Sequence, residues 1–131
     1  MIFVDTSAWF AAYVPNDAHH IAADTFLQGV NERLVTTDWV IDELLTLLKA
    51  RGEFQRVVLL GEPLLRGLPA RLEWVQTADV FEAWVVFHTH TDKAWSFTDC
   101  VSQVVMARLG VSKAFAFDDH FRQFGAVTVV P

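Results

Sequence analysis

Cysteine is almost absent from this sequence, which contains one, Cys100, in 131 residues. A lone cysteine cannot form a disulfide within the chain, and this agrees with a reducing cytoplasm. We expect Cys100 to pack as a small apolar residue. A basic leader with a cleavage site is also lacking after Met1, and no apolar run approaches the roughly 20 residues that cross a bilayer. The sequence therefore predicts a cytoplasmic protein that does not enter a membrane.

Positive charge is scarce as well, with 10 Lys and Arg against 16 Asp and Glu and a net charge of −6. This balance argues against the broad basic surface on which most nucleic-acid binding depends. An acidic excess suits a nucleic-acid substrate if it gathers around bound cations, because these reverse the local charge.

Glycine and proline are few, at 6 and 4 residues, and no run of them divides the chain. Hydrophobic residues make up 53% of the sequence and charged residues only 20%. This composition is enough to bury one sizeable core and leaves little for a second. We therefore expect residues 1–131 to form one domain.

Short apolar runs that end in acidic or hydroxyl residues alternate with longer stretches of helical periodicity. Strands are expected at residues 2–4, 34–37, 113–117 and 127–130, with weaker candidates at 72–75 and 93–95. Helices are expected at residues 8–14, 17–30, 38–51, 53–66, 77–88 and 100–109. This alternation is typical of α/β proteins and predicts helices on both faces of a central parallel sheet of four or five strands.

Three aspartates follow predicted strands. Asp5 follows the first strand, Asp99 lies just beyond the weak candidate at 93–95, and Asp118 ends the strand before the last one. Open parallel α/β sheets bind ligands at the carboxyl ends of their strands. We therefore expect the three carboxylates to share one edge of the sheet.

Glu43 lies inside a predicted helix, three residues after Val40 and four before Leu47. This spacing places it beside the apolar stripe of that helix, so its side chain should point inward. An isolated buried carboxylate is costly, so a purely structural role does not account for Glu43. We expect it to reach the same edge of the sheet.

Carboxylates that gather in one place repel one another, by about 4 kcal/mol per pair at a separation of about 4 Å and an effective dielectric of about 20. A divalent cation removes that cost. The ligands would all be oxygens, which suits Mg²⁺ or Mn²⁺ and argues against zinc. Such ions mostly serve phosphate chemistry, because they activate water and neutralise a leaving oxygen.

Each aspartate could also have a purely structural role. Asp5 can cap a helix, Asp99 can form a capping box with Ser96, and Asp118 can stabilise a turn. Their joint placement at strand ends favours a common site over three separate coincidences.

Two groups of residues are expected to be structural. His19 and His20 lack the i+4 partner of a helical zinc pair and are expected in solvent. The larger aromatic residues are expected in the core or at an interface rather than under nucleic-acid bases; they include Trp9, Phe10, Trp39, Trp84 and Trp95.

Four segments, at residues 2–7, 37–44, 96–99 and 117–121, read IFVDTS, TDWVIDEL, SFTD and FDDHF. In this order they resemble the motifs of PIN domains, in particular the VapC toxins of prokaryotic toxin–antitoxin pairs. Each motif alone is weak, but the four together span the chain and make the resemblance specific.

The resemblance implies a PIN-like three-layer α/β/α sandwich and an endoribonuclease that uses Mg²⁺ or Mn²⁺ to cleave structured RNA such as tRNA or rRNA. It also implies a homodimer and inhibition by a cognate antitoxin. The catalytic and metal-binding residues would be Asp5, Glu43, Asp99 and Asp118. Thr6 and Ser96 would be supporting hydroxyls. Asp119 stands where such toxins often carry a basic residue, so the RNA contacts of Asp119, His120 and Arg122 stay open.

Two other functions are compatible with a domain of this size. A response-regulator receiver has an acidic Mg²⁺ pocket, but it needs adjacent acids after the first strand, and Asp5 is followed by Thr6. A PIN-like domain that has lost catalysis and only binds RNA or protein is the other, and four intact acidic residues argue against it.

Overall fold

Five parallel strands form the centre of the structure, a computed structural model that describes residues 1–131. In chain order they are β1 (Ile2–Val4), β2 (Leu34–Thr37), β3 (Arg71–Glu73), β4 (Lys113–Phe115) and β5 (Thr128–Val130). They lie side by side in the order β3-β2-β1-β4-β5, and every neighbouring pair is parallel. The expected α/β class with a parallel central sheet is confirmed.

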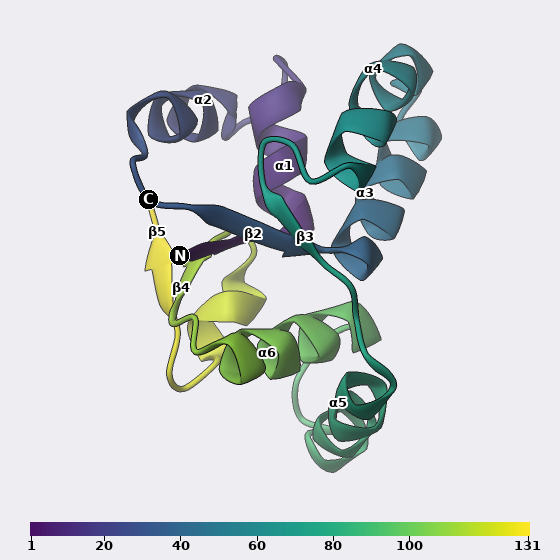
Figure 1. Cartoon of the computed structure of the whole chain (residues 1–131), viewed down its shortest axis with the longest axis vertical. Helices are drawn as coiled ribbons and strands as arrows, with labels where there is room; N and C mark the ends of the chain where they lie inside the picture. The colour runs from purple at the N-terminus through teal and green to yellow at the C-terminus, as the bar shows by residue number, and fades with distance from the viewer.

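Helices cover both faces of this sheet. They are α1 (Thr6–Tyr13), α2 (His20–Gly29), α3 (Asp38–Ala50), α4 (Phe54–Leu65), α5 (Thr77–Thr89), α6 (Phe97–Leu109) and the 3₁₀-helix η1 (Asp119–Gln123). Figure 1 shows α1 to α4 on one side of the sheet, and α5, α6 and η1 on the other. The three-layer α/β/α arrangement is therefore confirmed. None of the helices has the length and apolar character needed to span a membrane.

The central strand β1 is buried along its whole length, because helices cover both of its faces. Phe3 of this strand pairs with Val35 of β2 on one side and Ala114 of β4 on the other. The carboxyl ends of these three strands therefore lie next to each other. Whatever follows each strand is delivered to one edge of the sheet, which positions the candidate site.

Polar groups in the core find partners beside this strand. The hydroxyl of buried Thr36 donates a hydrogen bond to the carbonyl of Val4 at 2.9 Å, and it accepts one from the indole N–H of Trp9 at 3.4 Å. These bonds satisfy groups whose burial alone would be costly. They also fix α1 against the first two strands of the sheet.

The weak strand expected at residues 93–95 is wrong. This segment is a loop between α5 and α6, and Trp95 is buried there with its ring against that of Phe124, at a centroid distance of 5.1 Å. The other weak candidate is confirmed, since Arg71–Glu73 pairs with β2 as an edge strand. The three residues Lys93 to Trp95 could not by themselves distinguish a strand from a loop that buries one aromatic ring.

The helix α3 begins at Asp38, as expected, and Thr37 caps it, because the Thr37 side chain accepts a hydrogen bond from the Val40 N–H at 3.1 Å. The Asp38 carboxylate instead accepts a hydrogen bond from the Val75 N–H at 2.7 Å, which anchors the chain after β3. The second helix begins at His20, a few residues later than expected.

A buried ion pair joins α5 and α6. Asp79, which is 2% exposed, accepts hydrogen bonds from the Arg108 guanidinium at both of its carboxylate oxygens, each at 2.9 Å. Burial raises the pKa of Asp79, but the bonds from Arg108 and from the Gln76 N–H outweigh it and hold the pKa below its usual value. The pair therefore stabilises the folded protein while both charges are present.

Replacing Arg108 should destabilise the protein strongly. Arg108→Ala leaves the buried Asp79 carboxylate without its charged partner, and we expect a loss of about 2–3 kcal/mol in the free energy of unfolding at pH 7, measured with urea. Arg66→Ala is a matched control, because Arg66 pairs with Glu62 on an exposed surface and should cost less than about 1 kcal/mol. Equal losses in the two variants would contradict this assignment.

Candidate active site

Asp5 follows β1 and caps the N-terminus of α1. It is only 4% exposed, and its Oδ2 accepts two hydrogen bonds from Ser7, one from the backbone N–H at 3.1 Å and one from the hydroxyl at 2.7 Å. The same hydroxyl accepts a hydrogen bond from the Phe117 N–H at 3.0 Å. Ser7 thus ties the carboxyl end of β1 to the segment that follows β4.

Burial raises the pKa of Asp5 to about 7, although the hydrogen bonds from Ser7 lower it. The negative charge of Asp99 adds to the rise, which requires the two carboxylates to lie near each other. Without a cation, about half of the Asp5 side chains are therefore protonated at neutral pH.

Asp99 reaches the same place from the first turn of α6. It forms the expected capping box with Ser96: the Ser96 N–H donates to Asp99 Oδ2 at 2.9 Å, and the Asp99 N–H donates to the Ser96 hydroxyl at 3.0 Å. The prediction that Asp99 lies just beyond a strand is wrong, because a loop rather than a strand lies between α5 and α6. The helix cap, rather than a strand end, positions this carboxylate.

Glu43 lies in the second turn of α3 and is half-buried, as its place beside the apolar stripe predicts. Burial raises its pKa, the nearby Thr6 hydroxyl lowers it, and the charges of Asp99, Asp118 and Asp42 raise it further. These couplings place Glu43 among the three aspartates predicted for the site, or next to them. Asp42 is an additional acidic neighbour that the sequence did not single out.

Asp118 caps η1, and its Oδ1 accepts a hydrogen bond from the His120 N–H at 2.9 Å. The His120 ring nitrogen Nδ1 lies 2.7 Å from Oδ2 of Asp99 and 3.3 Å from Oδ1 of Asp118. A carboxylate can only accept, so this nitrogen carries a hydrogen and donates it. His120 therefore connects two of the four predicted residues.

Each of the three aspartates makes its hydrogen bonds through one carboxylate oxygen. These oxygens are Oδ2 of Asp5, Oδ2 of Asp99 and Oδ1 of Asp118. The second oxygen of each remains available to a ligand. The hydroxyl of Thr6 is also buried without a hydrogen-bond partner of good geometry. These free oxygens fit a hard divalent cation, which prefers oxygen ligands.

The carboxylates do not form a ready-made metal site. No group of three or more His, Cys, Asp or Glu side chains is placed so as to hold one ion. Charges of the same sign repel, and the bonds to Ser7 and Ser96 hold Asp5 and Asp99 on their own elements. A cation would therefore have to draw the free oxygens together.

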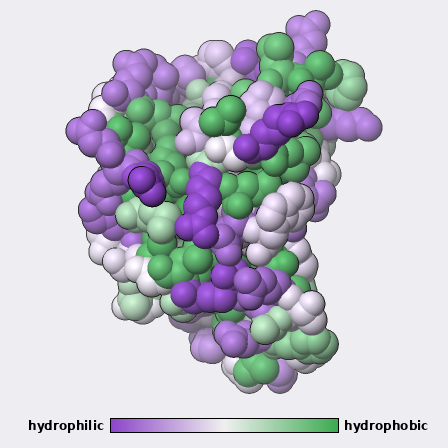
Figure 2. Space-filling view, in the orientation of Figure 1, coloured by the Kyte–Doolittle hydropathy of each residue, from purple (hydrophilic) through white to green (hydrophobic).

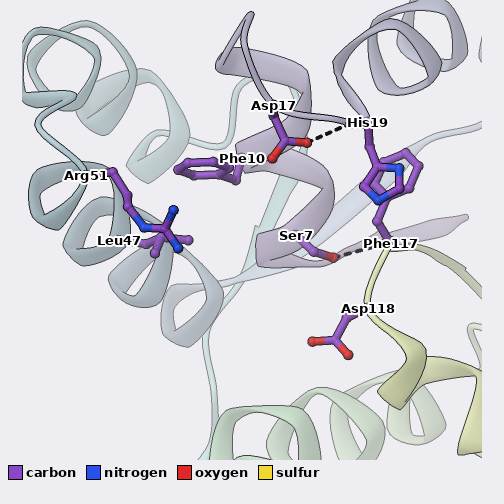
Figure 3. Close-up of a pocket in the computed structure, with 8 residues that line it drawn as sticks. All are labelled: Ser7, Phe10, Asp17, His19, Leu47, Arg51, Phe117 and Asp118. Atoms are coloured by element: carbon purple, nitrogen blue, oxygen red, sulfur yellow. Dashed lines mark hydrogen bonds between the residues drawn. The ribbon is translucent and has the colours of Figure 1, made fainter.

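Two hollows adjoin the acidic group. One has a volume of about 280 Å³ and is lined partly by Ser7 and Asp118, which Figure 3 shows between Arg51 and the His19 and Phe117 rings. The other, of about 430 Å³, is lined partly by Glu43 and Thr98. Leu47 of α3 lines both hollows, so they lie next to each other.

The structural expectations for the aromatic residues are met in part. Trp9 and Trp95 are buried, whereas Trp84 is 52% exposed on α5 and lies outside the core. His19 is exposed as expected, but its ring also stacks on that of Phe117, at a centroid distance of 4.6 Å. No sequence pattern indicates this contact, since the two rings come from opposite ends of the chain.

The fold and the family comparison agree. Residues 2–127 match the PIN domain family, so the chain belongs to it. The chain is 36% identical over 132 aligned residues to the 23S rRNA-specific endonuclease VapC20 of Mycobacterium tuberculosis, covering 100% of this chain and 99% of that protein. It is 31% identical to a VapC ribonuclease of Archaeoglobus fulgidus, over 90% of this chain and 77% of that protein.

Solved structures give the same result. The crystal structure of Mycobacterium tuberculosis VapC20, described as a toxin that cleaves the sarcin-ricin loop, matches with a TM-score of 0.91 and 32% identity, and each chain is covered completely. A toxin–antitoxin complex from Klebsiella pneumoniae matches at a TM-score of 0.68 and 9% identity, covering 100% of this chain and 97% of that one. The second likeness shows the fold alone.

The strand order excludes a receiver domain. Receivers have the order 2-1-3-4-5, in which β1 lies between the second and third strands. Here β1 lies between β2 and β4, and β3 is at the edge. The topology agrees with the resemblance to PIN domains.

Asp5→Asn should stabilise the metal-free protein at pH 8 and change little at pH 4. Asp5 has a pKa of about 7 in the folded protein, against about 3.9 in the unfolded chain, so the folded state binds the extra proton between these values. The stability contributed by this group is fully present below about pH 4 and is lost as the pH rises through about 7. Asparagine can still accept the Ser7 bonds.

Urea denaturation in EDTA from pH 4 to pH 8 measures this effect. The wild type should lose stability relative to Asp5→Asn across the interval, and Asp119→Asn serves as a control because the Asp119 side chain is 89% exposed. Parallel profiles of the wild type and Asp5→Asn would contradict the raised pKa.

Proposed function

We propose that this protein is a metal-dependent endoribonuclease that hydrolyses phosphodiester bonds in structured RNA such as rRNA or tRNA. The observation that carries the proposal is the set of aspartates at one end of a parallel sheet, each of which leaves one carboxylate oxygen free. The relation along the whole chain to a 23S rRNA-specific endonuclease supports the choice of substrate.

Asp5, Glu43, Asp99 and Asp118 would hold Mg²⁺ or Mn²⁺. When bound, such a cation supplies Lewis-acid chemistry, because it activates water and neutralises charge on a leaving oxygen. Binding would also lower the pKa of Asp5, which burial now raises, since a neighbouring positive charge favours the carboxylate form.

Ser7 and His120 act as positioning residues in this scheme. Ser7 turns Oδ2 of Asp5 toward α1, and His120 holds one oxygen each of Asp99 and Asp118. Partners of this kind orient ligands, and their loss typically costs about 10–100-fold in metal affinity or activity. His120 therefore acts through the carboxylates, and nothing requires it to touch the RNA.

The protein would act in the cytoplasm as the toxin of a toxin–antitoxin pair, as a homodimer held inactive by its cognate antitoxin. Figure 2 shows hydrophobic surface over α4 and at the end of the molecule formed by α5. Val58 and Leu59 on α4 are 65% and 72% exposed, and Phe81 on α5 is 68% exposed. Apolar patches of this kind mark protein interfaces.

Asp99→Asn should reduce RNA cleavage at least about a hundredfold while the protein stays folded. The change removes one charged ligand, but an asparagine oxygen can still accept the Ser96 N–H and keep the helix cap. Cleavage of rRNA by the purified protein is measured with Mn²⁺ or Mg²⁺, and excess EDTA should abolish it.

Asp119→Asn is the matched control, since it removes the same charge from an exposed residue next to Asp118. It should keep cleavage within about twofold. Robust cleavage in EDTA, or a fully active Asp99→Asn protein, would overturn the metal site. An inactive wild type that binds RNA would favour a PIN-like binding domain.

A homodimer is the second expectation. At micromolar concentration the protein should sediment at twice its monomer mass, and a charge placed on the apolar surface should dissociate it. Val58→Glu on α4 and Trp84→Glu on α5 test the two surfaces separately, and one of them should give monomers. Sedimentation of the wild type as a monomer would contradict the dimer.

A further inference from the structure

The hollow of about 280 Å³ beside Asp118 has walls of different chemistry. Figure 3 shows Arg51 on one side and the rings of His19 and Phe117 on the other, with Ser7 and Asp118 between them. Binding sites for drug-sized ligands usually measure about 300–1,000 Å³, so this one is slightly smaller than that range. Its size suits a single nucleotide.

Arg51 is one of very few basic residues without an acidic partner. Seven of the ten Lys and Arg residues form ion pairs, which leaves three unpaired: Arg33, Lys49 and Arg51. Of these three, only Arg51 lines the hollow beside the acidic group. The protein has a net charge of −6, so an unpaired guanidinium beside the acidic group is unusual and favours a negatively charged ligand there.

Local structure fixes where this arginine stands. Arg51 is the C-terminal cap of α3, and Gly52 follows it with a φ of 77°, a conformation that glycine adopts without strain. The chain turns sharply there, and the exposed Arg51 side chain extends over the hollow. A guanidinium matches the geometry of a phosphate, to which it can donate two hydrogen bonds.

The opposite wall is a pair of stacked rings. The His19 and Phe117 rings are nearly parallel, at an interplanar angle of 8°, and His19 is exposed. One face of the imidazole covers Phe117, and the exposure of His19 leaves the ring pair accessible to a base. RNA-binding proteins stack unpaired bases on aromatic rings in this way.

The hollow also contains the carboxylate of Asp17, which would repel a phosphate. Its Oδ2 already accepts a hydrogen bond from the His19 N–H at 2.9 Å and so helps to hold the ring pair. Asp17 makes no ion pair with Arg51, whose donors stay free. A phosphate is thus favoured at Arg51 and disfavoured elsewhere in the hollow.

We propose that this hollow binds one unpaired nucleotide of the RNA substrate next to the scissile bond, with the phosphate on Arg51 and the base on the His19–Phe117 ring pair. The assignment rests on the proposed ribonuclease function, because Asp118 belongs to both the hollow and the predicted metal site. The substrate class is RNA that presents an unstacked base, as in a loop, rather than a continuous duplex.

Binding of a fluorescent single-stranded RNA, with Ca²⁺ in place of Mn²⁺, tests the phosphate contact. Arg51→Gln should raise the dissociation constant about tenfold. The slope of log binding constant against log salt concentration should fall in magnitude by about one, because one phosphate contact is lost. Arg33→Gln removes another unpaired charge, directly before the start of β2 and outside the hollow. It should change binding less than twofold. Arg51→Lys should keep most of the affinity.

The ring pair is tested in the same assay. His19→Ala should weaken binding about fivefold or more, whereas His19→Phe keeps a flat ring and should stay within about twofold of the wild type. All these substitutions are at exposed residues, so thermal melting should show that every variant is folded. Equal effects of Arg51→Gln and Arg33→Gln, no rescue by His19→Phe, or no binding by the wild type would overturn the nucleotide site.

A parallel cleavage assay with Mn²⁺ separates the two proposals. Cleavage by the wild type that Arg51→Gln and His19→Ala leave unchanged in KM overturns the nucleotide site and leaves the ribonuclease standing. Binding that depends on Arg51 and His19, without any cleavage, supports the nucleotide site and overturns the enzymatic function.

Discussion

The burial of Asp5 at the carboxyl end of β1 is the constraint on which the rest of the site depends. A carboxylate removed from water is costly unless hydrogen bonds or opposite charges compensate it. Ser7 provides two of those bonds, and its hydroxyl also accepts the Phe117 N–H. The requirement to satisfy one buried carboxyl group therefore fixes the segment that carries Asp118. His120 then continues the connection from Asp118 to Asp99.

Much of this architecture could be predicted from sequence because it depends on local patterns. The apolar runs at Ile2–Val4 and Leu34–Thr37 are short and end in capping residues, and both form the expected strands. The rule that parallel strands end at one edge then brings Asp5 and Asp118 close together without further information. Glu43 is recognisable because a carboxylate beside an apolar stripe is costly to bury and rarely serves packing alone.

The remainder depends on contacts between distant segments, which leave little trace in one sequence. The sequence predicts that Asp99 lies just beyond a strand, whereas a helix cap delivers it. The hydrogen bond between His120 and Asp99 joins residues 21 positions apart in the sequence. It forms only because η1 packs close to the start of α6. Arg51 and His19 become neighbours of one hollow only through the packing of α1 against α3. Sequence periodicity does not predict contacts of this kind between distant residues.

The pairing of β1 with β4 has a consequence for the synthesis of the protein. Phe3 lies against Ala114, so the first strand acquires this neighbour only after more than a hundred further residues have been translated. Such long-range pairings form late, because a long loop must close before any contact rewards it. A nascent chain on the ribosome therefore has at most three of the four predicted site residues in place until Asp118 has emerged. The order of the strands therefore delays assembly of the acidic group until β4 and the residues after it have been synthesised.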